Sequence, residues 1–162
     1  MNIKNVVSDK KVKRKIILII LGMYSAFFVI GSVLAPVLAY LKMYEYSANL
    51  TYLFSHSCHQ QPLKSFCLFG YPVALCCRCF GVYVGTSIFA FLNVFKDVKF
   101  NKLFIILMIM LTVVDMSINY IFKYSTGLYP RFISGISSGI LIVIGIVFIF
   151  DVIEKRRSDE KN

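Results

Sequence analysis

The sequence has no internal repeat, no low-complexity linker and little polar chain in which a second domain could fold. Charged residues make up only 16% of it, against 58% hydrophobic residues, and the mean hydropathy is +0.73. A soluble domain of 162 residues with this composition would leave too much apolar surface in water. These shortages argue against a solenoid, a soluble catalytic domain and a two-domain transporter, and they indicate an integral membrane protein.

Four apolar segments are long enough to cross the hydrocarbon core of a bilayer, which takes about 20 helical residues. They predict an all-α, polytopic membrane fold with four transmembrane helices. The expected organisation is a basic N-terminal segment at 1–15, one four-helix domain at 16–152 and a charged tail at 153–162, with helices at about 16–41, 72–95, 103–122 and 132–152 and an outer loop at about 42–71.

Two of these segments need comment. The first is preceded by the basic run KKVKRK, but its apolar stretch exceeds the 7 to 15 residues typical of a signal-peptide core, so we expect it to remain as an anchor. The second opens with CCRC, so we expect Val82 to Phe95 to do most of the spanning, with a re-entrant start as the alternative.

The distribution of Lys and Arg predicts the orientation in the membrane. Thirteen of the 18 fall before the first segment, between the second and third segments, or after the fourth. Because positively charged loops resist translocation, we expect a multi-pass protein of the cell membrane with cytoplasmic N- and C-termini. The net charge of +10 then reflects this bias and attraction to the lipid bilayer, and we expect no nucleic-acid partner.

All five cysteines and both histidines lie between positions 56 and 79. In the predicted topology this stretch faces outward. Thiolate and imidazole are good zinc ligands, and the pair Cys58-His59 followed by Cys76-x-x-Cys79 could enclose a tetrahedral ion. We therefore predict that an outer Cys/His loop folds onto the second helix and holds zinc or another transition metal through Cys58, His59, Cys76 and Cys79.

Three alternatives stay open at this point. Neighbours on an extended chain point in opposite directions, so the site could use only one of Cys58 and His59 and be completed by His56 or Cys67. An outward CxxC pair could instead exchange disulfides, although an odd number of cysteines leaves one thiol over. Finally, the cysteines could be ordinary small hydrophobic residues of a helical bundle, as we expect for Cys77.

The run CHQQPLKSF at 58–66, followed by CCRCFGVYVG at 76–85, resembles the signature of a family of small uncharacterised integral membrane proteins, domain of unknown function family 2085. The resemblance covers about 55–139, since it extends through an Asp in the third segment, the stretch TGLYPR and the small residues after it. It implies Cys58, His59, Cys76 and Cys79 as the shared set, and Lys64 stands where the family usually has Arg. The family name implies no reaction.

Asp115 is an ionisable residue inside the third apolar segment, and Asn119 lies one turn later on the same helical face. A charge inside a spanning helix costs about 2.5 to 3.5 kcal/mol on insertion scales and usually faces a partner in the bundle. One interpretation is a structural ion pair, with Arg131 as the nearest basic candidate and Arg78 as another. The other makes Asp115 catalytic, as a base beside the metal or as an acceptor for His59.

Small residues on the second and fourth segments predict close helix packing. Gly135 and Gly139 are four residues apart, and Gly81 and Gly85 have the same spacing and could supply the matching surface. We assign this stripe to packing within the bundle or within a homo-oligomer. Tyr83, between the second pair, is expected to be an interfacial anchor.

The functional prediction follows from the metal site. With three protein ligands and an open position, the metal could activate water while Lys64, Arg78 and Arg131 neutralise an anionic lipid or small-molecule substrate. Supporting roles are expected for Asn119, His56, Gln60 and Tyr83. One alternative is a structural or regulatory membrane metal-binding protein without catalysis, and another is a thiol-disulfide redox protein that uses the CxxC pair.

Overall fold

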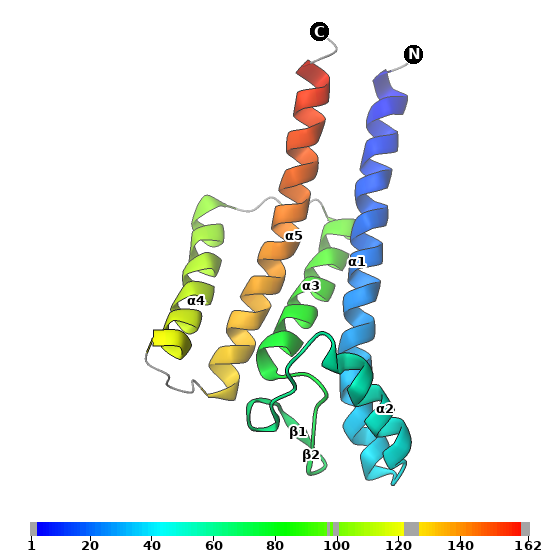
Figure 1. Ribbon diagram of the computed structural model, residues 1–162. Coiled ribbons are helices and arrows are strands. Elements are labelled where there is room, and N and C mark those ends of the chain that lie inside the picture. Colours follow the sequence, from blue (N-terminus) through cyan, green and yellow to red (C-terminus); the bar gives the residue numbers. More distant parts are fainter. Residues whose placement is uncertain (1–2, 97, 99–100, 122–126, 160–162) are drawn as a thin grey trace.

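The computed structural model describes residues 3–96, 98, 101–121 and 127–159, and in this part the chain is an all-α polytopic membrane protein (Figure 1). The α-helices are α1 (Ile3–Tyr40), α2 (Tyr44–Ser55), α3 (Cys77–Phe95), α4 (Lys102–Ile121) and α5 (Leu128–Asp159). The short elements are a 3-10 turn, η1 (Pro62–Lys64), and the strands β1 (Cys67–Leu68) and β2 (Tyr71–Pro72). Four segments of the described chain can cross a membrane: Val12–Tyr40, Cys77–Phe95, Lys102–Ile121 and Leu128–Ile153. The prediction of four spans is confirmed.

The helix boundaries differ from those expected in α1, α3 and α5. Helix α1 begins at Ile3 rather than near residue 16, since no Pro or Gly interrupts the basic stretch before the apolar one. Helix α3 begins at Cys77 rather than near residue 72, because Cys76 has extended backbone angles (φ −68°, ψ 155°) and Pro72 belongs to the hairpin. Helix α5 runs from Leu128 to Asp159 rather than from about 132 to 152, since no Pro or Gly interrupts the charged stretch after the apolar one.

The helices α1, α3 and α5 lie side by side, with α3 in the middle, and α4 packs chiefly against α5 (Figure 1). Helix α1 begins, and helix α5 ends, at one end of the molecule. Helix α2 and the hairpin lie at the opposite end, beside the start of α3. The fold therefore separates the two terminal segments from the part of the chain that carries the cysteines.

Four glycines bring the backbones of α3 and α5 into direct contact. A Cβ added at Gly85 would lie 2.5 Å from the carbonyl oxygen of Ile136, and one added at Gly81, Gly135 or Gly139 would also collide with the backbone of the facing helix. Small residues are what allows membrane helices to approach this closely. The predicted match between the two pairs of glycines is confirmed, and this contact fixes the position of α3, whose first turn carries two of the cysteines.

The segment between α2 and α3, residues 56–76, is docked onto α1 through a proline. Pro36 lacks an N–H, so the carbonyl of Ser32, one turn earlier, has no donor from within the helix at that position. The backbone N–H of Ala74 donates to this carbonyl over 3.2 Å. We treated 42–71 as a loop, but part of it is the helix α2, which folds back along α1 and places the ring of Phe54 against Gly31.

Candidate metal centre

The sulfur atoms of Cys58, Cys76 and Cys79 all lie within 4.8 Å of one another. Zinc–sulfur bonds of about 2.3 Å at tetrahedral angles would place two sulfurs about 3.8 Å apart, so a small inward movement would suffice to hold an ion. Cys58 comes from the segment after α2, while Cys76 and Cys79 come from the start of α3. The group therefore joins the segment between α2 and α3 to a membrane-spanning helix.

The turn after Cys58 directs two backbone donors at its sulfur. The N–H of Gln60 donates to Cys58 Sγ over 3.4 Å, and the N–H of Cys76 does so over 3.3 Å. Gln60 adopts a positive φ of 45°, and its side-chain amide donates to the carbonyl oxygen of Thr51. These contacts hold the sulfur of Cys58 in place beside the start of α3.

The other two cysteines occupy the N-terminus of α3. Cys76 is the N-cap and Cys79 is the third helical residue, where backbone N–H groups and the helix dipole favour negative charge. The thiols of Cys58 and then Cys79 donate hydrogen bonds to Cys76, and these bonds lower the pKa of Cys76 well below its usual range. Cys76 is thus the thiolate of the group, which is the form of sulfur that binds metal, whereas Cys79 is a thiol that donates hydrogen bonds to Cys58 and Cys76.

The remaining cysteines and the histidines lie outside this group. Of the adjacent pair, Cys58 is 5% exposed and points inward, whereas His59 is exposed. His56 is also exposed and packs edge-on against Tyr52. Cys67 is exposed in β1, and Cys77 is buried. The structure therefore brings together three of the four predicted ligands, in agreement with the alternative in which only one of the adjacent pair contributes.

Apolar side chains surround the three sulfurs on the side of α1 and α2. Cys58 belongs to a buried cluster with Phe28, Phe54 and Leu75, and Tyr83 packs against this cluster. The ring of Tyr83 stacks on that of Phe28 at 4.5 Å. Tyr83, which we predicted to be an interfacial anchor, is thus a wall of the cysteine site. Such a wall limits the access of water to one side of the group.

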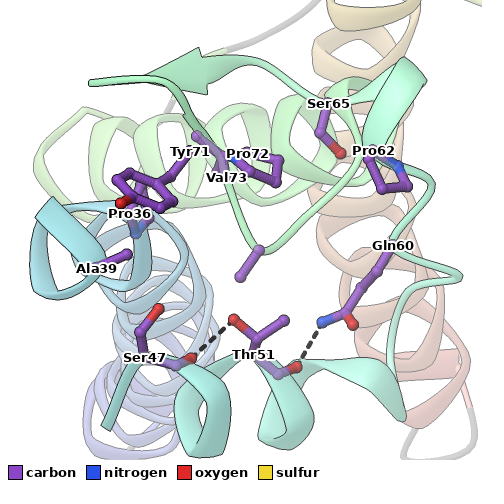
Figure 2. Close-up of a pocket in the computed structure, with 11 residues that line it drawn as sticks. Pro36, Ala39, Ser47, Thr51, Gln60, Pro62, Ser65, Tyr71, Pro72 and Val73 are labelled. Atoms are coloured by element: carbon purple, nitrogen blue, oxygen red, sulfur yellow. Dashed lines mark hydrogen bonds between the residues drawn. The ribbon is translucent and has the colours of Figure 1, made fainter. Parts of the chain in front are cut away.

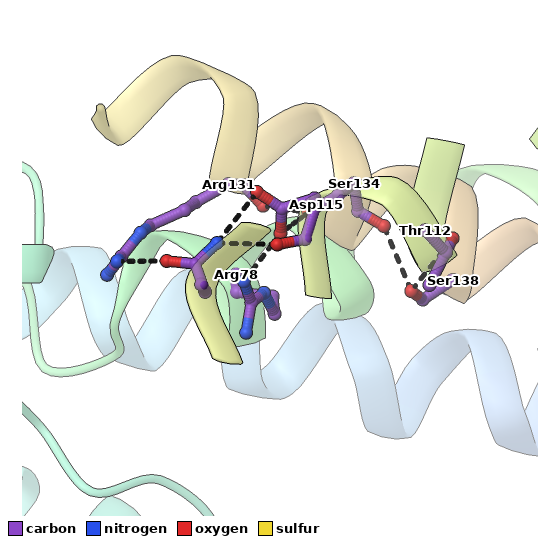
Figure 3. Close-up of polar contacts among 7 residues, drawn as sticks. Arg78, Thr112, Asp115, Arg131, Ser134 and Ser138 are labelled. Atoms are coloured by element: carbon purple, nitrogen blue, oxygen red, sulfur yellow. Dashed lines mark hydrogen bonds and ion pairs between the residues drawn. The ribbon is translucent and has the colours of Figure 1, made fainter. Parts of the chain in front are cut away.

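A second polar cluster lies where α3, α4 and α5 meet (Figure 3). Asp115 is 7% exposed, and its carboxylate forms an ion pair with Arg78 at 2.5 Å. It also accepts hydrogen bonds from Ser134 Oγ at 2.8 Å and Asn119 Nδ2 at 3.2 Å. Arg131, likewise 7% exposed, donates to Asn119 Oδ1 at 2.5 Å. A structural ion pair of Asp115 is therefore present with Arg78, one of the two expected candidates, and Arg131 joins the same cluster through Asn119.

Sequence reasoning missed Ser134 as a partner of Asp115. We read Ser134 only as a small residue beside Gly135, but its hydroxyl donates both to the carboxylate and to the carbonyl of Arg131. The signal that could have identified it is a serine one helical turn from an arginine, on a helix that is expected to face an acidic residue within the membrane. The contacts of Asp115 favour a structural role, and its catalytic role stays a prediction.

The predicted anion-binding residues fall into two places. Arg78 and Arg131 lie in the first turns of α3 and α5, within the polar cluster of Asp115. Lys64 lies in η1, on the segment between α2 and α3, and is partly exposed. With two arginines and one carboxylate, this cluster has an excess of one positive charge. Arg78 and Arg131 therefore hold helices together and also provide a positive charge that can attract an anion.

Comparison with known proteins gives the same assignment for most of the chain. The family model described as predicted membrane protein (DUF2085) matches residues 58–145, which include all three clustered cysteines, Asp115 and Arg131. An uncharacterised protein of Methanocaldococcus jannaschii is 33% identical over 147 residues, which cover 85% of this chain and 94% of that protein. No solved structure matches the chain significantly. The chain belongs to the DUF2085 family of membrane proteins.

Proposed function

We propose that the protein is a membrane metal-binding protein in which Cys58, Cys76 and Cys79 hold a transition metal, zinc in the first place. The observation that carries this proposal is the approach of three sulfurs to within 4.8 Å, from two separate parts of the chain. Thiolates are soft ligands that favour zinc, Cu(I) and iron–sulfur clusters over Mg²⁺ or Ca²⁺. Zinc is the simplest choice because it accepts a tetrahedral set of sulfurs without redox chemistry.

Three protein ligands are the number that a catalytic zinc uses, with the fourth position taken by water or substrate. On this basis we propose that the metal acts as a Lewis acid towards an anionic lipid or small molecule. Lys64 and the positive excess of the Arg78–Asp115–Arg131 cluster would offset the charge of the substrate. A structural or regulatory metal is the alternative, and it requires a fourth protein ligand, for which His59 beside Cys58 is the nearest candidate in sequence.

Elemental analysis of the protein purified in detergent tests the metal. We expect zinc near one ion per chain, lost in Cys76→Ser and Cys79→Ser and retained in the matched controls Cys67→Ser and Cys77→Ser. Retention of zinc in His59→Ala would support the open fourth position, whereas its loss would support the structural alternative. Absence of any metal from the wild-type protein would overturn the proposal.

One observation favours a second candidate, which is thiol-disulfide exchange. Cys76 and Cys79 form a CxxC pair at a helix N-terminus, and the pKa of Cys76 is lowered by the neighbouring thiols. In this reaction Cys76 attacks a substrate disulfide and Cys79 then displaces the substrate, so the pair is oxidised and the substrate gains two thiols. Thiol counting separates the candidates: a metal protein releases thiols on chelation, and a redox protein releases them only on reduction.

A further inference from the structure

A cavity of about 190 Å³ lies between α1, α2 and the segment that connects α2 to α3 (Figure 2). Its polar lining consists of the hydroxyls of Ser47, Thr51, Ser65 and Tyr71 and the amide of Gln60. None of its lining side chains is charged. Gln60 joins this cavity to the cysteine group, because its side chain lines the cavity while its backbone N–H bonds to Cys58 Sγ. Neither the family description nor the metal proposal assigns a role to this cavity.

The hydroxyl hydrogens of this lining are used within the protein. Ser47 Oγ donates to the carbonyl of Ala35 at 2.9 Å, and Thr51 Oγ1 donates to the carbonyl of Ser47 at 2.8 Å. Ser65 Oγ donates to the carbonyl of Gln61 at 3.1 Å. Each of these oxygens still has lone pairs that can accept a hydrogen bond. The hydroxyls therefore offer the cavity acceptors rather than donors.

The backbone of the lining is equally short of donors. Pro36, Pro62 and Pro72 have no N–H. The N–H of Val73 donates to the carbonyl of Phe66, and that of Ala74 donates to the carbonyl of Ser32.

The two remaining polar side chains of the lining are those of Gln60 and Tyr71. One amide hydrogen of Gln60 is used on the carbonyl of Thr51, and its Oε1 is a further acceptor. The hydroxyl of Tyr71 is hydrogen-bonded to Tyr44, and this bond raises the pKa of Tyr71. The cavity is thus rich in neutral oxygen acceptors and carries an aromatic ring.

We propose that this cavity binds the primary ammonium group of a small amine. An ammonium has three N–H donors and no acceptor, which complements the lining oxygens, and its charge is attracted to the face of an aromatic ring. Anions are disfavoured because they need donors, which are scarce here, and a divalent metal ion normally recruits charged ligands, which are absent from this lining. The volume equals that of about six water molecules at about 30 Å³ each, enough for an amine of ethanolamine size.

Isothermal titration of the detergent-purified full chain with three matched probes tests the proposal. Ethanolamine offers an ammonium with three donors, choline has the same charge without N–H donors, and glycolate is an anion of similar size. We expect ethanolamine to bind at least about tenfold more tightly than choline, because each hydrogen bond from a charged group that choline cannot form weakens its binding by about tenfold or more. Glycolate should not bind. Equal binding of choline, or binding of glycolate, would overturn the proposal.

A pair of variants on α2 locates the binding. Thr51→Val removes one acceptor at constant shape and should weaken ethanolamine binding about tenfold. Ser55→Ala is the matched control, because Ser55 is exposed, bonds back to the carbonyl of Tyr52 and does not line the cavity. Thermal melting checks that both variants are folded, and Ser65→Ala replaces Thr51→Val should the latter fail to fold. An unchanged affinity in the folded cavity variant would refute the assignment.

The amine could be free or part of a lipid headgroup, and both share the ammonium. Nanodiscs of phosphatidylcholine with or without phosphatidylethanolamine distinguish the two sources. Competition between the phosphatidylethanolamine discs and free ethanolamine indicates a headgroup site, and binding of ethanolamine unaffected by the lipid indicates a free amine. Loss of ethanolamine binding in both discs would contradict the proposal. None of the three clustered cysteines lines the cavity, so retained binding in Cys79→Ser separates this proposal from the metal proposal.

Discussion

Replacing Asp115 by Asn should destabilise the protein although the side chain keeps its size. One carboxylate oxygen accepts hydrogen bonds from Arg78 Nη2 and Ser134 Oγ, and the other accepts from Asn119 Nδ2. An asparagine must place its NH₂ group at one of these two positions. In either orientation this NH₂ group faces another hydrogen-bond donor, and in both orientations the charge of Arg78 loses its carboxylate partner.

The magnitude follows from the burial of the pair. Removing one partner of a buried ion pair costs about 3 to 5 kcal/mol. Asp115 is almost fully buried, but the Arg78 side chain is 31% exposed and regains some hydration, so we expect a loss of about 3 kcal/mol in the free energy of unfolding. Arg78→Met should also destabilise, and the double variant should lose about 2 kcal/mol less than the sum of the single losses.

Denaturant unfolding of the four proteins in mixed micelles measures this coupling. Asp151→Asn is the control, because Asp151 is 59% exposed and its ion pair with Arg14 is 3.6 Å long, and it should cost less than about 1 kcal/mol. Additive losses for Asp115 and Arg78 would refute the ion pair as a source of stability. Unchanged stability and metal content with lost cellular function would instead support the catalytic role of Asp115.

Three further predictions address other parts of the fold. Gly139→Val should cost about 3 kcal/mol, because a Cβ there would lie 2.7 Å from Thr86 N, whereas Gly145→Val, with open space around it, should unfold like wild type; equal stabilities would contradict the glycine contact. Pro36→Ala supplies an N–H for the carbonyl that Ala74 now bonds, so hydrogen exchange at Ala74 should accelerate about fivefold, and unchanged exchange would argue against this docking. A C-terminal green fluorescent protein fusion should fluoresce and an alkaline phosphatase fusion should be inactive; the reverse pattern would invert the topology.

Much of the fold could be predicted because a bilayer imposes a length on apolar segments. The spans, the glycine contact and the clustering of the cysteines all follow from local composition and spacing. Divergence of adjacent side chains left open a site that uses only one of Cys58 and His59, but the structure was needed to show that Cys58 is the one in the group. The helix α2 was not predicted, because its sequence lies between two membrane segments and its packing on Gly31 depends on how the chain turns at its positive-φ residue Lys42.

The sequence by itself determined that this is a four-span membrane protein with a thiol-rich stretch at 58–79, because hydrophobic length and residue chemistry are local properties. Only the tertiary structure decided which groups meet. Asp115 of α4 pairs directly with Arg78 in the first turn of α3. The two meet because the glycine contact holds α3 tightly against α5, the helix on which α4 also packs. The acceptor-lined cavity exists because Pro36 frees a carbonyl that draws Ala74 onto α1. Both results depend on distances between residues far apart in the chain, which no spacing within a segment encodes.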